Sequence, residues 1–350
     1  MKEKKYQASY GLLRIIACFS VVFHHFISAN QQYINTLESQ GMYTAVDNLL
    51  MCNNCLFFML SGKFALEHYK GGIGRFYKDK ALKIVLPFFL FSVYYYLADG
   101  GLASGTCSLW GFVKAFMGCE ILGYLWFVYS LIGFYLVVPF LAPMMKAMGL
   151  KEKRWLTILL IMALLPRNLC QIMGWPFVLN GFPFYYLTFM LLGYLLDNIG
   201  LDKKIEYLMY GLSIPAAIVS CYIAVYKPGW NPDIQDYCLS RVLMCIGIFL
   251  FITRRTVRLS DLMHKPIKWV ADQTYYLYLI HILTQGFFFT YLWNVWVLLV
   301  KLPFLFALFL GSIIIFVLSL PMAFVCKKCL DYIVLGLGKI GSIGNTDGNE

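Results

Sequence analysis

Long apolar runs separated by short polar stretches dominate the chain. The first run, residues 10–28, is long enough to cross a bilayer, because a spanning helix needs about 20 apolar residues. Similar runs follow along the rest of the chain, and the pattern predicts about ten membrane-spanning helices. They are expected at residues 10–28, 46–66, 82–98, 124–145, 155–173, 182–198, 205–226, 239–253, 275–294 and 302–325.

The distribution of basic residues predicts how these helices are oriented. If the N-terminus lies in the cytoplasm, the inner segments hold 22 of the 29 Lys and Arg residues and the outer segments hold five. The other two, Arg14 and Lys63, lie within predicted spans. Cytoplasmic loops of membrane proteins carry such a basic excess. The alternation therefore predicts that both the N-terminus and the C-terminus are cytoplasmic.

The composition indicates an all-α, polytopic protein of the cell membrane. Hydrophobic residues make up 60% of the chain and charged residues 13%, which excludes an ordinary soluble domain. The formal net charge of +11 lies mostly on the inner side, so it indicates contact with anionic lipid rather than nucleic acid. We expect one membrane domain over residues 1–330 and a cytoplasmic, partly disordered tail over residues 331–350, whose end is rich in Gly and Asn.

The eleven cysteines include two CxxC pairs. Cys52 and Cys55 lie near the outer end of the second predicted span, whereas Cys326 and Cys329 lie at the inner end of the last. Pairs on opposite faces of a membrane cannot form one four-thiolate zinc site, so no metal is expected. Cys52 and Cys55 are interpreted as small buried side chains, with a redox pair as the alternative.

The first span carries ionisable residues, which are costly inside a bilayer and often mark a functional site. At 100° per residue, the eleven steps from Arg14 to His25 make three turns plus about 20°, so both residues lie on one helix face about 16 Å apart. His24 lies about 80° away from that face. The alternative is structural, because a histidine can bond a neighbouring helix and an arginine can reach the headgroups.

Other polar residues add to the candidate site. In the second span, Ser61 and Gly62 permit a close helix approach or local unwinding, and Lys63 follows them as a second cation within a span. His281 lies about a turn and a half into the ninth span, where a structural histidine is the default interpretation. The basic inner loop at residues 68–87 fits a positive-inside loop and equally a phosphate-binding surface, because the same side chains can serve both.

Taken in order, these blocks resemble the membrane acyltransferase-3 family over residues 8–325. The resemblance rests on Arg14-x10-His25, FFMLSG at 57–62, the basic run that ends at Pro87, LWF at 125–127 followed by Tyr135 and Pro139, and YxxYLIH at 275–281. The family implies about ten transmembrane helices. It also implies transfer of an acyl group, commonly acetyl from acetyl-CoA, to a hydroxyl of a cell-surface or exported glycan.

The resemblance implies a division of roles among the candidate residues. His25 is expected to act as the general base, and Arg14 is expected to guide or anchor the pantetheine arm of acyl-CoA or to steady the site through another polar side chain. The donor phosphates are expected at Arg75, Lys80 and Lys83, and the substrate channel at Ser61, Lys63, Trp126, Tyr278 and His281. Acyl-CoA is a substrate, so no permanently bound cofactor is implied. A homo-oligomer is compatible with the sequence.

Two features differ from the family pattern. The family often has arginines just before the third span, where this chain has Lys80 and Lys83, which keep the charge but lack the bidentate guanidinium. No appended extracytoplasmic domain is expected, so acceptor binding would fall to the membrane domain or to partners.

Two other functions fit several of the same features. A transporter or flippase of a lipid-linked glycan would also have many spans, polar outer loops and buried cations. Transporters often have two related halves, however, and residues 10–150 and 180–325 show no convincing repeat. A sensory or anchoring membrane module is the third alternative, and it would tolerate the loss of both Arg14 and His25.

Overall fold

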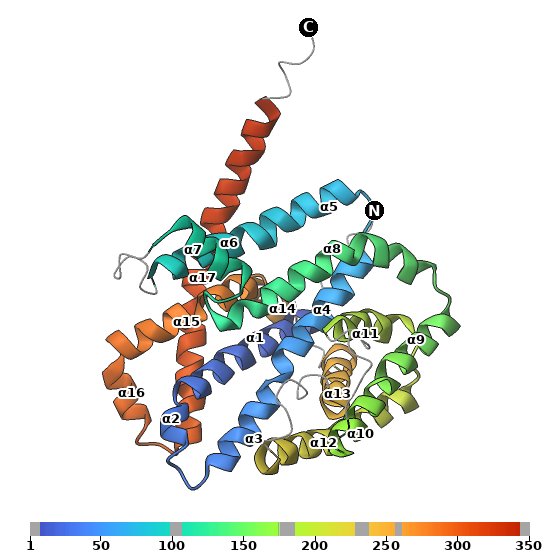
Figure 1. The fold of residues 1–350 in the computed structure, drawn as a ribbon, viewed down its shortest axis with the longest axis horizontal. Helices are drawn as coiled ribbons and strands as arrows, with labels where there is room; N and C mark the ends of the chain where they lie inside the picture. Colours follow the sequence, from blue (N-terminus) through green and yellow to red (C-terminus); the bar gives the residue numbers. More distant parts are fainter. Residues whose placement is uncertain are drawn as a thin grey trace.

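The computed structural model describes residues 8–98, 107–173, 175, 186–227, 238–255 and 261–343. All of the elements in this part of the chain are helices, which confirms the predicted all-α class (Figure 1). The predicted outer segments at 99–123, 167–183 and 227–241 lie partly outside the described residues. The same is true of the predicted tail, of which residues 344–350 are outside.

The helices follow one another with short connections. Their bounds are α1 Ala8–Ala29, α2 Gln31–Ile34, α3 Gln40–Leu50, α4 Cys52–His68, α5 Ile73–Lys80, η1 Ala81–Val85, α6 Leu86–Tyr96, α7 Leu109–Met117, η3 Gly123–Leu125, α8 Trp126–Ala147, α9 Leu150–Met162, α10 Leu164–Met173, α11 Tyr186–Asn198, α12 Lys203–Tyr226, α13 Leu239–Arg255, α14 Asp261–Ala271, α15 Thr274–Tyr291, α16 Trp293–Leu299 and α17 Phe304–Ile343.

Five helical segments among the described residues are long and apolar enough to cross a membrane. They are Ala8–Ala29, Gln40–His68, Gly123–Ala147, Lys203–Tyr226 and Phe304–Val334. A sixth is added if α15 and α16, which meet at an angle of 86°, count as one bent span. Helices occur within all ten predicted stretches, but several are shorter than a full span. The number of ten spans and the cytoplasmic termini therefore stay predictions.

Helix α1 lies at the centre of the bundle. It packs against α3, α4, α13, α14, α15 and α17. Its side chains Leu13, Ala17, Val22 and Phe26 are buried. Helices in a bilayer associate through packing and small residues rather than through exclusion of water. The central position of α1 explains how its polar side chains can meet residues from several other helices.

The close approach expected at Ser61-Gly62 is confirmed where α4 crosses α11. A Cβ atom added to Gly62 would lie 1.9 Å from the backbone oxygen of Met190. A Cβ atom on Gly193 would lie 1.9 Å from the backbone oxygen of Met59. Because real Cβ atoms do not approach that closely, the two backbones can touch only with glycine at both positions.

The basic inner segment forms a helix that runs from α5 through η1 into α6. Gly72 precedes it with a φ of 79°, a left-handed conformation that suits glycine. Residues Ala81–Val85 are a π-helix. Pro87 has no N–H to donate to Lys83, four residues earlier, which favours a wider turn at this place. The Tyr275 hydroxyl of α15 donates to the Ile84 carbonyl at 2.7 Å and holds the π-helix against the bundle.

The last helix is the longest described element, since α17 continues over 40 residues to Ile343. Its second half extends beyond the rest of the bundle (Figure 1). The helix thus includes residues 331–343, the first part of the segment predicted as a tail. The domain boundary at residue 330 is not tested and stays a prediction.

Candidate active site

Two histidines that are far apart in the sequence lie side by side in the bundle. The ring of His25, from α1, has its centroid 5.1 Å from that of His281, from α15. Tyr124, from η3, completes the group, with its ring centroid 5.6 Å from His25 and 5.2 Å from His281. His25 is half-buried and His281 is fully buried. We refer to His25, Tyr124 and His281 as the histidine cluster.

The tautomer of His281 follows from its backbone contact. Its Nδ1 atom lies 2.6 Å from the carbonyl oxygen of Tyr278. A carbonyl oxygen only accepts hydrogen bonds, so Nδ1 carries the proton and Nε2 of the neutral ring holds a lone pair. This Nε2 atom is buried and has no hydrogen-bond partner among the described residues. The histidine cluster therefore contains an acceptor atom that the described part of the chain does not use.

The other aromatic candidates divide between the histidine cluster and a neighbouring group. Tyr278 lies next to the histidine cluster. Its hydroxyl donates to the backbone carbonyl of Tyr124, and its ring centroid is 5.9 Å from that of His281. Trp126 belongs to a different aromatic group, with ring centroids 4.8 Å from Tyr186 and 6.3 Å from Phe58. Tyr278 is thus brought to His25, whereas Trp126 packs between α4 and α11.

His24 has a carboxylate partner that the sequence did not reveal. Its Nδ1 atom lies 2.6 Å from Oδ1 of Asp47 on α3. Its ring centroid is also 5.0 Å from that of His25. The helical phase correctly separates the two histidines, since His24 faces α3 while His25 faces α15. The sequence feature that could have predicted this pair is Asp47 itself, an acidic residue at the outer end of the second predicted span.

Arg14 lies between α4 and α8, toward the predicted cytoplasmic side. Its guanidinium carbon is 5.5 Å from the centroid of the Phe64 ring. The partly buried Tyr135, from α8, interacts electrostatically with Arg14 and through a side-chain hydrogen bond with Ser61. Ser61 and Arg14 are therefore brought together through Tyr135, a residue of the family motif.

Among the described contacts, Lys80 is the one proposed phosphate ligand that meets the group of Arg14, Ser61 and Tyr135. Its Nζ atom lies 4.6 Å from the centroid of the Tyr135 ring and 5.4 Å from that of Phe76. Burial lowers the pKa of Lys80 from its usual value. Lys83 is mostly exposed and pairs with Asp79 at 2.5 Å, and Arg75 is exposed. The structure thus separates Lys80 from Arg75 and Lys83.

Lys63 belongs to an ion-pair network at the end of α4. Its Nζ atom lies 2.6 Å from Glu67 and 2.7 Å from Asp197, a buried carboxylate of α11. Asp197 also accepts the Tyr10 hydroxyl and lies 3.6 Å from Arg254 of α13. These contacts join four helices. They give Lys63 a structural role, whereas its predicted role in a substrate channel is not tested.

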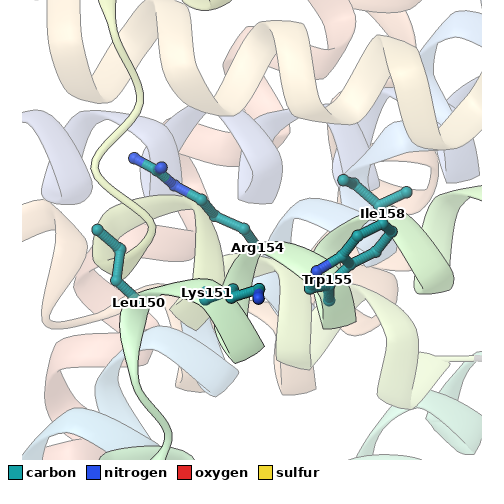
Figure 2. Close-up of a pocket in the computed structure, with 5 residues that line it drawn as sticks. All are labelled: Leu150, Lys151, Arg154, Trp155 and Ile158. Atoms are coloured by element: carbon teal, nitrogen blue, oxygen red, sulfur yellow. The ribbon is translucent and has the colours of Figure 1, made fainter.

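A surface hollow of about 320 Å³ lies along α9 (Figure 2). It is lined by Leu150, Lys151, Arg154, Trp155 and Ile158. The Arg154 guanidinium donates to the backbone oxygens of Ile199 and Gly200 at 2.9 and 3.2 Å. All of the lining residues come from one helix, and none is a predicted site residue. The hollow is therefore separate from the histidine cluster. The described residues also contain no group of three or more His, Cys, Asp and Glu side chains that could hold a metal.

The fold and the site define a polytopic helical membrane protein with two imidazoles and a guanidinium held between its helices. A model of the acyltransferase-3 family, described as an acyltransferase domain, matches residues 7–326, and the chain belongs to this family. It is therefore a membrane O-acyltransferase in general terms, as the sequence motifs indicated. No curated protein and no solved structure gives a significant match to the chain.

Proposed function

We propose that this protein transfers an acyl group, in the first instance acetyl, from cytoplasmic acyl-CoA to a hydroxyl of an extracytoplasmic or cell-surface glycan. The cell membrane is the proposed location. The observation that carries the proposal is the arrangement along α1, where Arg14 and His25 each meet polar or aromatic groups from other helices. One helix could thus connect a donor on one side of the membrane with an acceptor on the other.

The donor side of the proposal rests on Lys80 and Arg14. Coenzyme A carries anionic phosphates, and cationic side chains bind phosphate oxygens. The Tyr135 ring lies under Lys80, and its hydroxyl is within electrostatic range of Arg14. We propose that Lys80 binds a phosphate, with Arg75 and Lys83 adding positive charge at the surface. The thin pantetheine arm would then pass Arg14 and bring the thioester close to His25.

The acceptor side of the proposal rests on His25. A neutral imidazole, whose unperturbed pKa is about 6.5, can take a proton near neutral pH. His25 would take the proton from the acceptor hydroxyl while that oxygen attacks the thioester carbonyl. The carbon–sulfur bond then breaks, and His25 returns the proton to the departing thiolate. The products are the O-acyl glycan and free CoA, so neither a covalent enzyme intermediate nor a bound cofactor is needed.

The test is an assay of purified protein for acetyl-CoA-dependent thiol release with a surface glycan fraction as acceptor. The variant His25→Ala should lose turnover by at least about a hundredfold, the low end of what a general base contributes. The matched variant His24→Ala removes an adjacent imidazole and should lower turnover by less than about tenfold. Wild-type turnover in His25→Ala combined with its loss in His24→Ala would show that the base is assigned to the wrong histidine.

A measurement in cells would test the acceptor class. Deletion of the gene should remove O-acyl groups from a surface polysaccharide, as detected by mass spectrometry. Complementation with the wild-type gene should restore them, and complementation with His25→Ala should not. Unchanged acyl content in the deletion strain would contradict the glycan acceptor.

A further inference from the structure

We propose that His281 binds the acceptor, by accepting at Nε2 a hydrogen bond from a second hydroxyl next to the one that His25 deprotonates. This inference rests on the proposed function and narrows the acceptor class. The acceptor would be a sugar with hydroxyls on adjacent carbons rather than an isolated alcohol. His25 and His281 would each contact one of the two oxygens.

The first support is the state of the His281 ring. Its Nδ1–H is committed to the Tyr278 carbonyl at 2.6 Å, which leaves Nε2 as an acceptor only. His281 is completely buried, so bulk water does not reach the ring freely. A buried acceptor without a donor is unfavourable, and such groups in proteins are usually partnered by ligand, water or chain. A ligand hydroxyl that enters the histidine cluster would supply the missing donor.

The second support is that three nearby hydroxyls already have backbone partners, whereas the Tyr124 hydroxyl, like Nε2, has none among the described residues. The Tyr278 hydroxyl donates to the Tyr124 carbonyl, and the Thr284 hydroxyl donates to the Ile280 carbonyl at 3.3 Å. The Tyr95 hydroxyl donates to the Leu279 carbonyl at 2.8 Å. These donors serve the backbone of α15 and of η3. None of these three hydroxyls donates to Nε2, which lies beside His25 with 5.1 Å between the ring centroids, and the Tyr124 hydroxyl is the one alternative donor in the cluster.

The third support is the position of the histidine cluster relative to the donor residues. His25 lies one turn from the end of α1, and its neighbour His24 pairs with Asp47 of α3. Lys80 contacts Tyr135 farther along α8, and Arg14 interacts electrostatically with the same tyrosine. With the predicted cytoplasmic N-terminus, the cluster would be on the side where an external acceptor enters. The pantetheine arm also carries amide N–H donors, and the experiment must separate the two ligands.

The experiment uses a matched pair of variants in the full-length protein. In His281→Asn, the side-chain amide can still donate to the Tyr278 carbonyl, but nothing replaces Nε2. In His281→Gln, the longer amide can bring an oxygen to the place of Nε2. The probes are acetyl-CoA, methyl glucoside and its monodeoxy derivatives. For the wild type, removal of the hydroxyl adjacent to the acylated one should raise the acceptor KM about tenfold, the effect of one hydrogen bond.

The expected result is a loss of this discrimination in His281→Asn. In this variant, the KM for methyl glucoside should rise about tenfold and the KM for acetyl-CoA should not change. The derivative that lacks the hydroxyl next to the acylated one should then have the same KM as methyl glucoside. His281→Gln should recover part of the discrimination. A structural role alone would not make the variant indifferent to the missing hydroxyl.

Three results would overturn the inference. The first is unchanged discrimination in His281→Asn, and the second is a rise in the KM for acetyl-CoA instead, which would assign Nε2 to the donor. The third is the same loss of discrimination in Tyr124→Phe, which would make the phenol the hydroxyl ligand. Absence of transfer from acetyl-CoA to methyl glucoside by the wild type would also overturn the inference that the acceptor is a sugar diol. The proposed function is tested separately by the acyl content of surface glycans in cells. It stands if that acylation depends on the gene and fails if it does not, whatever the result for His281.

Discussion

The rings of His25 and His281 lie with their centroids 5.1 Å apart and their planes inclined by 35°. They come from α1 and α15, which pack against each other. The two imidazoles are not equivalent, because His281 is fixed to the backbone through Nδ1 and His25 is half-buried. This asymmetry supports the two proposed roles, in which His25 is the general base and His281 binds the acceptor through a hydrogen bond.

The two lysines of the basic helix should differ in their effect on the donor. Lys80→Ala should raise the KM for acyl-CoA about tenfold, because a charged hydrogen bond to phosphate contributes about 1.5–3 kcal/mol. Lys83→Ala should change it less than about twofold, because Lys83 is mostly exposed and pairs with Asp79. Initial rates at varied acyl-CoA concentration give both values. Equal effects of the two substitutions would contradict the assignment of the phosphate to Lys80.

Acyl-CoA binding should weaken at alkaline pH through Lys80. Burial lowers the pKa of this ammonium group, so it loses its charge at a lower pH than an ordinary lysine does. The KM for acyl-CoA should therefore be lowest near neutral pH and rise as the pH increases. Lys80→Arg should remove most of the rise, since a guanidinium stays charged throughout this range. A rise that is the same in wild type and Lys80→Arg would show that another group is responsible.

The His24–Asp47 pair should support the site without carrying the proton transfer. Asp47→Asn and His24→Ala should each lower kcat by less than about tenfold, because both disturb one hydrogen-bonded contact beside His25. The double variant should lose no more than either single variant, since both remove the same interaction. The measurement is kcat at saturating donor and acceptor. Additive losses would mean that the two side chains act independently.

The glycine crossing between α4 and α11 should be intolerant of any side chain. Gly62→Ala and Gly193→Ala should each destabilise the protein by about 1–3 kcal/mol or more, because the new Cβ would overlap a backbone oxygen. Gly211→Ala is the control, since no atom lies within 4 Å of its added Cβ. The readout is the unfolding temperature in detergent. A Gly62→Ala protein as stable as the Gly211→Ala protein would contradict the close contact.

Several features of the site could be predicted from local sequence alone. The relative direction of Arg14, His24 and His25 depends on the period of a single helix, so the spacing was sufficient. The close approach at Gly62 was also visible, because only a residue without a side chain allows two helix backbones to touch. The order of motifs was enough to indicate the acyltransferase-3 family, which the match over residues 7–326 confirms.

The partners of these residues depend on how separate helices pack. His281 meets His25 although 256 positions separate them in the sequence, and Asp47 of α3 meets His24. Tyr135 of α8 interacts with both Lys80 and Arg14. The π-helix begins directly after Lys80 and contains Lys83, and the two lysines meet different partners, Tyr135 and Asp79, which their spacing did not predict.

The sequence by itself determined the helical class, the helix faces and the family of this protein, because hydrophobic periodicity and motif order are properties of single segments. Only the tertiary structure decided which candidate residues share a site. The physical reason is that a helix sets the direction of its own side chains, whereas the packing of neighbouring helices sets what those side chains meet. Lys63 illustrates the difference, since its position as a cation within a span was evident but its pairing with Asp197 of α11 was not.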